Sequence, residues 1–286
     1  MVLAVQSYRR YPVPATLTGV AEHAWVARHA PGRPHREVLL PDGRGLLQVV
    51  RGVPGTLVEP LSGTRRDDVD GVRGPWTSPS VAEQTGPVAR LGVQLHPLGP
   101  VRLLGRPAAD TWLPVTDVLP ADVLTRVGVL LDGRDDDGAV ATVLDALEAA
   151  PRRTGAELEL LEDALAFVDA RHGLVRSGDV AREIATSLGE LHRWCTHLLG
   201  TTPAQYLSAV RFSSFVRESV GTGPVDASAT VAAVDWFVAA GYSPREVERF
   251  TGLPPVELRR LAERLARLVG PADGGRTSTG PAATGD

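Results

Sequence analysis

The sequence predicts an α+β protein in which a β-rich N-terminal domain precedes an all-α C-terminal domain. Up to about residue 115, short β-branched runs alternate with turns rich in Pro and Gly, which is typical of antiparallel strands. From Pro120 onward, apolar residues recur every three to four positions, as on one face of a helix. Capping residues then separate several short helices near residue 190. A chain of 286 residues suits two domains, because domains commonly have ~100–200 residues.

The β-rich domain is expected to span residues 1–150. Runs such as Leu46–Val50 and Leu91–Leu95 are separated by turn signals such as Pro41-Asp42-Gly43, so we expect a sandwich or a small barrel. Two helices should trail these strands, at residues 121–131 and 139–149.

The helical domain is expected to span residues 156–270, after a linker at residues 151–155. One apolar stripe indicates its first helix: Leu158, Leu161, Leu165 and Val168. The last helix has a leucine row inside and an arginine row outside: Leu258, Leu261, Leu265 and Leu268, with Arg259, Arg260, Arg264 and Arg267. Residues 271–286 have too little apolar content to fold, which predicts a disordered tail.

Between these helices, residues 180–203 carry the signature of a helix-turn-helix. A short helix with one apolar stripe is indicated by Val180, Ala181, Ile184 and Leu188. Ser187 and Glu190 then form a capping box that begins a second helix. The buried face of that helix is predicted to be Leu191, Trp194, Cys195 and Leu198. Gly200 suits a left-handed C-cap, and Thr202-Pro203 begins the next helix. Such a unit lays its second helix in the major groove of DNA.

The exposed face of the helix at residues 188–199 is therefore the candidate base-reading surface. It carries Gly189, His192, Arg193 and Thr196, and the cap residues Ser187 and Glu190 at its start are counted with the DNA-binding residues. Arg193 is the natural base reader, because a guanidinium can bond guanine O6 and N7 together, whereas His192 suits a base edge or a phosphate. The alternative for both residues is an ordinary solvated surface. Thr201, Thr202 and the N-terminus of the helix at residues 203–220 are well placed to bind a phosphate of the DNA backbone.

At these positions the chain resembles the AraC/XylS-type transcriptional regulators. The matching residues are Ala181, Ser187, Leu191–Cys195, Gly200–Pro203, Tyr206-Leu207 and Arg211. The chain departs from the family at Ala185, where a Gly is usual, and at Cys195, where a Phe is usual. The resemblance implies a regulator that binds double-stranded DNA and responds to a small-molecule effector, which the sequence does not identify.

The N-terminal region resembles the sensor half of one branch of the same family. The resemblance is carried by Leu40–Gly43, Leu91–Pro97 and Leu103–Pro107. It implies a β-rich sensor or dimerisation domain, for which a cupin-like fold is one alternative. Ordinary hairpin turns are the other interpretation of these phrases.

A second helix-turn-helix, expected from the resemblance, is shortened. Ala240–Ser243 and Phe250–Pro255 match the two ends of the family pattern, but the interval between them is about five residues short. A helix still begins after Ser243, and its remaining Arg245 and Arg249 are suited to phosphates. We therefore expect one base-reading helix per chain, with a homodimer supplying any second half-site.

Composition argues against other functions. All 30 basic residues are arginine, so Schiff-base, pyridoxal phosphate and P-loop lysine chemistry are excluded. Cys195 is the single cysteine, and no His, Asp or Gly pattern matches a metal or dinucleotide site. We expect no enzyme activity, no cofactor and no metal. The absence of a long apolar run and of a secretory signal favours a cytoplasmic protein that does not bind a membrane.

The charge of the helical block leaves a second hypothesis open. Between Arg152 and Glu218, eight arginines stand against nine acidic residues, whereas a DNA-binding domain normally has a basic face. A degenerate regulator whose helical domain binds a protein partner would also explain this balance. The two hypotheses differ in the salt dependence of DNA binding, which is steep only for a DNA-binding protein.

Overall fold

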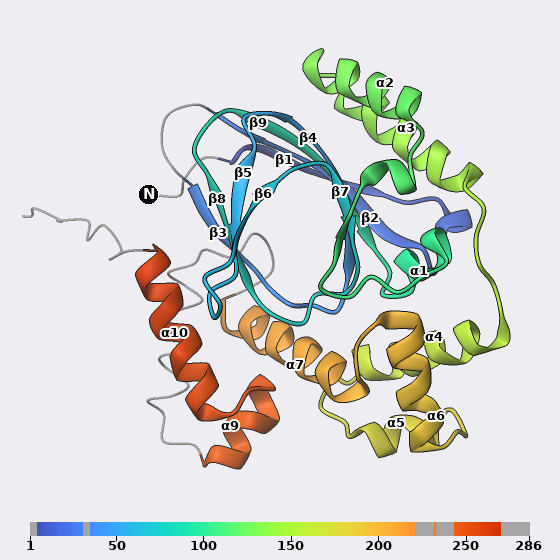
Figure 1. Ribbon diagram of the computed structural model, residues 1–286, viewed down its shortest axis with the longest axis vertical. Helices are drawn as coiled ribbons and strands as arrows, with labels where there is room; N and C mark the ends of the chain where they lie inside the picture. The colour runs from blue at the N-terminus through green and yellow to red at the C-terminus, as the bar shows by residue number, and fades with distance from the viewer. Residues whose placement is uncertain (1–4, 31–34, 221–231, 233–242, 270–286) are drawn as a thin grey trace, which may run out of the picture.

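The computed structural model describes residues 5–30, 35–220, 232 and 243–269. The N-terminal part contains two antiparallel sheets that curve around a common interior (Figure 1). The larger sheet contains, in spatial order, β1 (Val5–Pro12), β2 (Ala21–His29), β9 (Val88–Leu95), β4 (Gly45–Gly52), β7 (Gly71–Arg73) and β10 (Trp112–Leu113). The smaller contains β3 (His35–Leu39), β8 (Ser80–Gln84), β5 (Gly55–Val58) and β6 (Arg65–Asp68). The predicted β-rich N-terminal region is confirmed.

The two faces of the larger sheet differ in chemistry. In β4 and β9, alternate residues such as Leu47, Val49 and Leu91 are fully buried against the helical hairpin of α2 (Ala121–Asp132) and α3 (Asp136–Ala149). The intervening side chains, such as Gln48 and Arg90, point into the space between the sheets. The apolar core of this part thus lies between sheet and helices, while the interior between the sheets is polar.

The helices follow the sequence predictions closely. Helices α2 and α3 cover the segments expected to be helical, and the Asp135 carboxylate caps α3 by accepting from the Gly138 amide at 2.9 Å. A short helix, α1 (Gly99–Leu104), lies between β9 and β10. The C-terminal part contains α4 (Ala156–Asp169), α5 (Ser177–Glu183), α6 (Leu188–Trp194), α7 (Pro203–Val220), α9 (Pro244–Thr251) and α10 (Pro255–Val269). The predicted α+β architecture is therefore observed.

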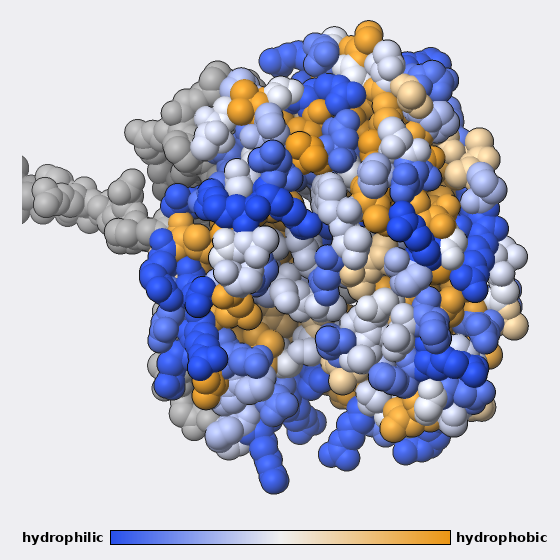
Figure 2. All heavy atoms as spheres, in the orientation of Figure 1, coloured by the Kyte–Doolittle hydropathy of each residue, from blue (hydrophilic) through white to orange (hydrophobic). Residues whose placement is uncertain are grey.

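The last helices pack on the smaller sheet. Val38, Val58 and Val81 of that sheet share a core with residues of α7, α9 and α10. The leucines of α10 face this core, whereas the arginines predicted outside are exposed, and the outer side of α10 is largely hydrophilic in Figure 2. Ala240–Tyr242 and the tail predicted at residues 271–286 lie outside the described residues. In the described part, no helix is long and apolar enough to span a membrane.

Candidate DNA-binding site

The predicted helix-turn-helix is formed by α5, a tight turn and α6. The turn places Ala185 in the left-handed region, at φ 51°, where a glycine would be unstrained. Its amide donates to the Arg182 carbonyl at 3.2 Å, and the Thr186 amide donates to the Ala181 carbonyl at 2.9 Å. These bonds end α5 and direct the chain into α6.

The start of α6 is capped as the sequence predicts. The Ser187 hydroxyl accepts from the Glu190 amide at 3.1 Å, and the Glu190 carboxylate accepts from the Ser187 amide at 3.4 Å. The same carboxylate accepts from the Thr186 hydroxyl at 3.0 Å, and these bonds lower the pKa of Glu190. Ser187 and Glu190 are thus engaged with each other, which assigns them to holding α6 in place.

The end of α6 widens before it stops. Residues Cys195–Leu199 form one π-helical turn, and Gly200 ends it at φ 84°. The Gly200 amide donates to the Cys195 carbonyl at 3.0 Å. The predicted helix over residues 188–199 and its left-handed C-cap are confirmed, with the last turn wider than an α-helix.

The buried face of α6 is the predicted one: Leu191, Trp194, Cys195 and Leu198. Cys195 is 3% exposed, and burial raises the pKa of its thiol to about 12. The described residues contain no group of three or more His, Cys, Asp or Glu side chains arranged to hold a metal ion. Cys195 is therefore a core residue.

The exposed face of α6 carries Gly189, His192, Arg193 and Thr196. Arg193 has a side chain 55% exposed, and its nearest carboxylate, the equally exposed Glu157, lies 3.9 Å away. Such a pair is weak in water, so the guanidinium can move to another partner. The Thr196 hydroxyl donates to the His192 carbonyl at 2.8 Å, which turns it toward its own helix.

Leu188 corrects one sequence expectation. It was assigned to the apolar stripe of the first helix, but its side chain is 55% exposed. The reason is the cap at Ser187, which makes Leu188 the first residue of α6 instead of the last apolar residue of α5. An exposed apolar side chain at this position suits the methyl group of thymine. The cap in the sequence was the signal that could have identified it.

The residues expected to contact a phosphate before α7 differ in exposure. Thr201 is 5% exposed, and its hydroxyl donates to Gln205 Oε1 at 3.2 Å, so its side chain does not reach the surface. Thr202 is more exposed and caps α7, because its hydroxyl accepts from the Gln205 amide at 3.2 Å. Only Thr202 of the pair has a side chain near the surface.

The shortened second unit ends in the small helix α9. Ser243 caps it by accepting from the Glu246 amide, and Gly252 ends it at φ 76° after eight residues. Arg245 and Arg249 are both exposed. Gly252 lies so close to Ser208 of α7 that an added Cβ would come within 2.5 Å of the Ser208 carbonyl oxygen. This contact fixes α9 against α7.

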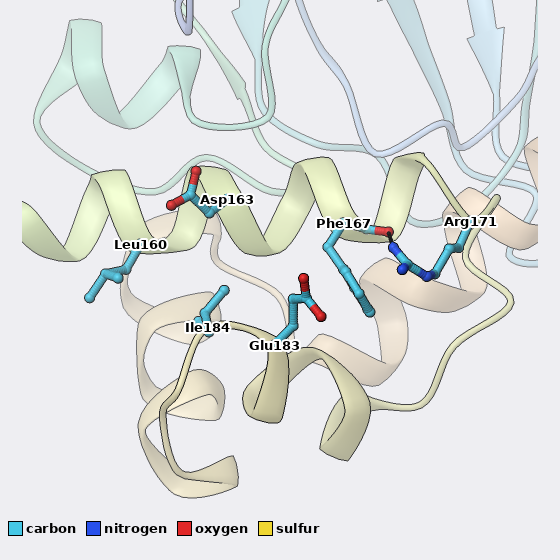
Figure 3. A pocket seen from close by; sticks show the side chains of 6 residues that line it. All are labelled: Leu160, Asp163, Phe167, Arg171, Glu183 and Ile184. Atoms are coloured by element: carbon cyan, nitrogen blue, oxygen red, sulfur yellow. Dashed lines mark hydrogen bonds between the residues drawn. The ribbon is translucent and has the colours of Figure 1, made fainter.

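An open surface groove of about 410 Å³ lies between α4 and α5 (Figure 3). The Arg171 guanidinium stacks on the Phe167 ring there, with its carbon 3.7 Å from the ring centre. The lining mixes apolar and acidic side chains: Leu160, Asp163, Phe167, Arg171, Glu183 and Ile184.

A larger cavity of about 570 Å³ lies between the two sheets and extends to the helical part. Its lining includes side chains of both sheets, such as Trp25 and Glu37, and of the helical part, such as His172, Ser213 and Arg217. Sequence reasoning missed this site, because its lining residues are spread over strands of both sheets and over the helical part.

Ion pairs join the cavity wall to the helices. Arg44 places Nη2 2.7 Å from the Asp169 carboxylate at the end of α4 and Nε 2.6 Å from the Glu22 carboxylate on β2. Arg217 of α7 places Nη2 3.2 Å from the Asp42 carboxylate. A change in the cavity wall can therefore reach α4 and α7 through these pairs.

No protein-family model and no curated protein matches the chain. Among solved structures, it is similar to ToxT from Vibrio cholerae O395, with 11% identity and a TM-score of 0.41 over 90% of this chain and 98% of that one. It is also similar to the AraC-like transcriptional activator CuxR, with 12% identity and a TM-score of 0.29 over 67% of this chain and 76% of that one. These values are too low to transfer a function, so the assignment below depends on this chain's own residues.

Proposed function

We propose that the protein is a sequence-specific DNA-binding transcriptional regulator of the AraC/XylS type that acts in the cytoplasm. The observation that supports this most strongly is α6. Its start is closed by the capping box of Ser187 and Glu190, its apolar face is buried, and its exposed face carries Arg193 and His192. A rigid helix that presents basic, donor-bearing side chains to solvent is what major-groove reading requires.

In this proposal, Arg193 reads a guanine by donating to O6 and N7 together, and His192 contacts a neighbouring base edge or phosphate. Leu188, at the start of the same helix, packs against a thymine methyl. Gly189 leaves room for the DNA backbone, since an added Cβ there would meet only the Ser187 hydroxyl, 3.9 Å away.

The second unit is proposed to position the protein without reading bases. The helix α9 has only eight residues, and Arg245 and Arg249 are suited to phosphates, which carry no sequence information. Each chain would then recognise one half-site, and a homodimer would recognise two. Arg245→Ala should weaken binding to all sequences equally. Two base-specific half-sites about one DNA turn apart, bound by a single monomer, would contradict this arrangement.

We further propose that the protein responds to a small-molecule effector held in the cavity between the sheets. The cavity volume of about 570 Å³ lies within the ~300–1,000 Å³ range of ligand pockets. The Arg44–Asp169 and Arg217–Asp42 pairs supply a route from its wall to the helices that carry α6. On this basis we divide the chain into a sensor domain at residues 1–150 and a DNA-binding domain at residues 156–270.

A second candidate function is the binding of a protein partner by the helical domain. The groove between α4 and α5 favours it, because Phe167 and Ile184 lie beside the acidic Asp163 and Glu183 there. Such a partner would be recognised without DNA.

The two functions are separated by binding to a random DNA library, followed by sequencing of the retained fragments. A regulator should enrich a short motif, and its affinity should fall steeply as salt rises, because each neutralised phosphate releases counterions. A protein that binds only a partner should enrich no motif. A flat salt response with no enriched motif would refute the proposal.

A further inference from the structure

Two arginines at one end of the cavity lack the close carboxylate partner that three of the other cavity arginines have, while Arg10 contacts His23 instead. Arg44, Arg90 and Arg217 each lie within 3.2 Å of a carboxylate oxygen. By contrast, Arg66 on β6 and Arg73 on β7 form no ion pair within the ranges that the structure describes. Arg66 is paired with Leu57 in the sheet register, so its side chain lies on the same sheet face as Leu57, which lines the cavity. Arg66 borders this lining through its contacts with Trp76 and Trp112.

The two arginines stack on tryptophans instead. The guanidinium carbon of Arg73 lies 3.7 Å from the Trp76 ring centre, and that of Arg66 lies 4.8 Å from Trp76 and 5.1 Å from Trp112. Stacking occupies the faces of a guanidinium and leaves its N–H edges available. Nη1 of Arg73 is buried and, in the described part of the chain, has no acceptor.

A third donor lies beside them. The indole Nε1 of Trp112 is also buried, without an acceptor among the described residues. Trp112 is paired with Arg73 in the sheet register, and its indole fits over Gly71 of β7, where an added Cβ would stand 2.1 Å from Nε1. Indole and guanidinium groups can donate but not accept, so the complementary group must be an acceptor.

The positive charges of Arg66 and Arg73 at this end of the cavity favour an anion as the ligand. Burial lowers the pKa of Arg73 to about 9, because the cost of holding its charge away from water exceeds the attraction of Asp42, Asp68 and Asp110. Asp68, which lies on the same strand as Arg66, is already bonded to Arg90 at 2.8 Å and Gln48 at 2.6 Å. A bound anion would accept from the buried donors and place a negative charge directly against Arg73.

We propose that Arg66, Arg73 and Trp112 form a site for the carboxylate of a small organic acid, whose apolar body lies along Trp25, Leu46 and Leu57 of the same cavity. This inference rests on the proposed effector role and names the chemical class of the effector. A monoanion fits better than a phosphate dianion, because the cavity wall also carries the carboxylates of Asp42 and Asp68.

The test is calorimetric titration of the full chain, without DNA, with three acids and their neutral amides: benzoate, cinnamate and decanoate against benzamide, cinnamamide and decanamide. At least one acid should bind about tenfold or more tightly than its amide, since charge-assisted hydrogen bonds are roughly twice as strong as neutral ones. Equal affinities within every pair, or no binding by any acid, would overturn the proposal. Tighter binding of phenyl phosphate than of benzoate would overturn the preference for a monoanion.

Three variants locate the site. Arg73→Gln should reduce the affinity for the acid about tenfold and leave that for the amide unchanged. Trp112→Phe keeps the ring and removes the N–H, so it should produce a smaller loss of the same kind and remains informative if the Arg73 variant does not fold. The matched control is Arg65→Gln, since Arg65 is exposed on the same strand as Arg66 and pairs with Glu83. A control that loses as much as Arg73→Gln would refute the assignment.

The outcome is separable from that of the proposed function, because the titration contains no DNA. Binding of an acid by a chain that selects no DNA motif would support the carboxylate site and refute the regulator. Selection of a motif by a chain that binds no acid would support the regulator and refute the carboxylate site.

Discussion

Replacing Ala185 by Gly should stabilise the protein. Ala185 has φ 51° in the turn between α5 and α6, and its side chain is exposed, so the methyl group contributes strain and little burial. A non-glycine residue in the left-handed region costs roughly 1–2 kcal/mol. The added freedom of glycine in the unfolded chain removes roughly 0.4–1 kcal/mol of this gain. We therefore expect Ala185→Gly to raise the free energy of unfolding by about 0.5–1 kcal/mol, from the difference of the two terms.

The assay is urea denaturation of the full chain, followed by far-ultraviolet circular dichroism and tryptophan fluorescence. The matched control is Ala204→Gly, at an exposed position in the first turn of α7, where glycine should cost about 0.5–1 kcal/mol. The two substitutions remove the same methyl group, so only the backbone conformation differs between them. A loss of stability in Ala185→Gly equal to that in the control would refute the left-handed turn.

Three further outcomes follow from single residues. Cys195 should react with a thiol reagent only as fast as the helical part unfolds locally, since this residue is 3% exposed and its thiol has a pKa of about 12. Rapid labelling in native buffer would show that α6 packs differently. Ser187→Ala should lower the free energy of unfolding by about 1 kcal/mol, because it removes the cap of α6, and no loss would show that the capping box contributes nothing. Burial raises the pKa of Glu37 from 4.5 to about 7, so its contribution to stability is full below pH 4.5 and is lost as the pH rises through 7. Urea titrations should therefore show the wild-type protein losing stability relative to Glu37→Gln across that range, and a constant difference would contradict the burial of Glu37.

Local signals in the sequence predicted the helix-turn-helix well. The capping boxes at Ser187 and Ser243 and the left-handed caps at Gly200 and Gly252 all depend on residues three to six positions apart. Such contacts leave a pattern that one sequence can show. Even the unusual turn at Ala185 was visible as a departure from the glycine of the resembling family.

The cavity could not be predicted in the same way. Arg66, Arg73 and Trp112 lie on β6, β7 and β10, in two different sheets, and no spacing along the chain relates them. The sequence of the run Leu46–Val50 also does not distinguish the two faces of its strand, because Gln48 is the only polar residue in it. Only strand pairing shows that one face packs on helices and the other lines a polar interior.

The structure partly explains why the helical block has about as many acidic as basic residues. Glu190 is held in its capping box, and Asp169 is paired with Arg44 on the sensor side. Asp169 is therefore less available to repel DNA than the sequence count implied, whereas Glu190, whose capping partners are uncharged, keeps its negative charge. Arg193, in contrast, is held only by a distant and exposed partner.

The central claim is that α6 reads bases through Arg193. The most direct measurement compares the DNA affinity of the wild-type protein with that of Arg193→Ala, on the selected motif and on each of its single-base variants. Fluorescence anisotropy should show that Arg193→Ala loses affinity for the motif and discrimination at one base pair, worth about 1–3 kcal/mol, while circular dichroism remains unchanged. Arg106→Ala, an exposed arginine in the sensor domain, serves as the control and should bind as the wild type does. Wild-type discrimination at every position in Arg193→Ala would show that α6 does not read DNA through this residue.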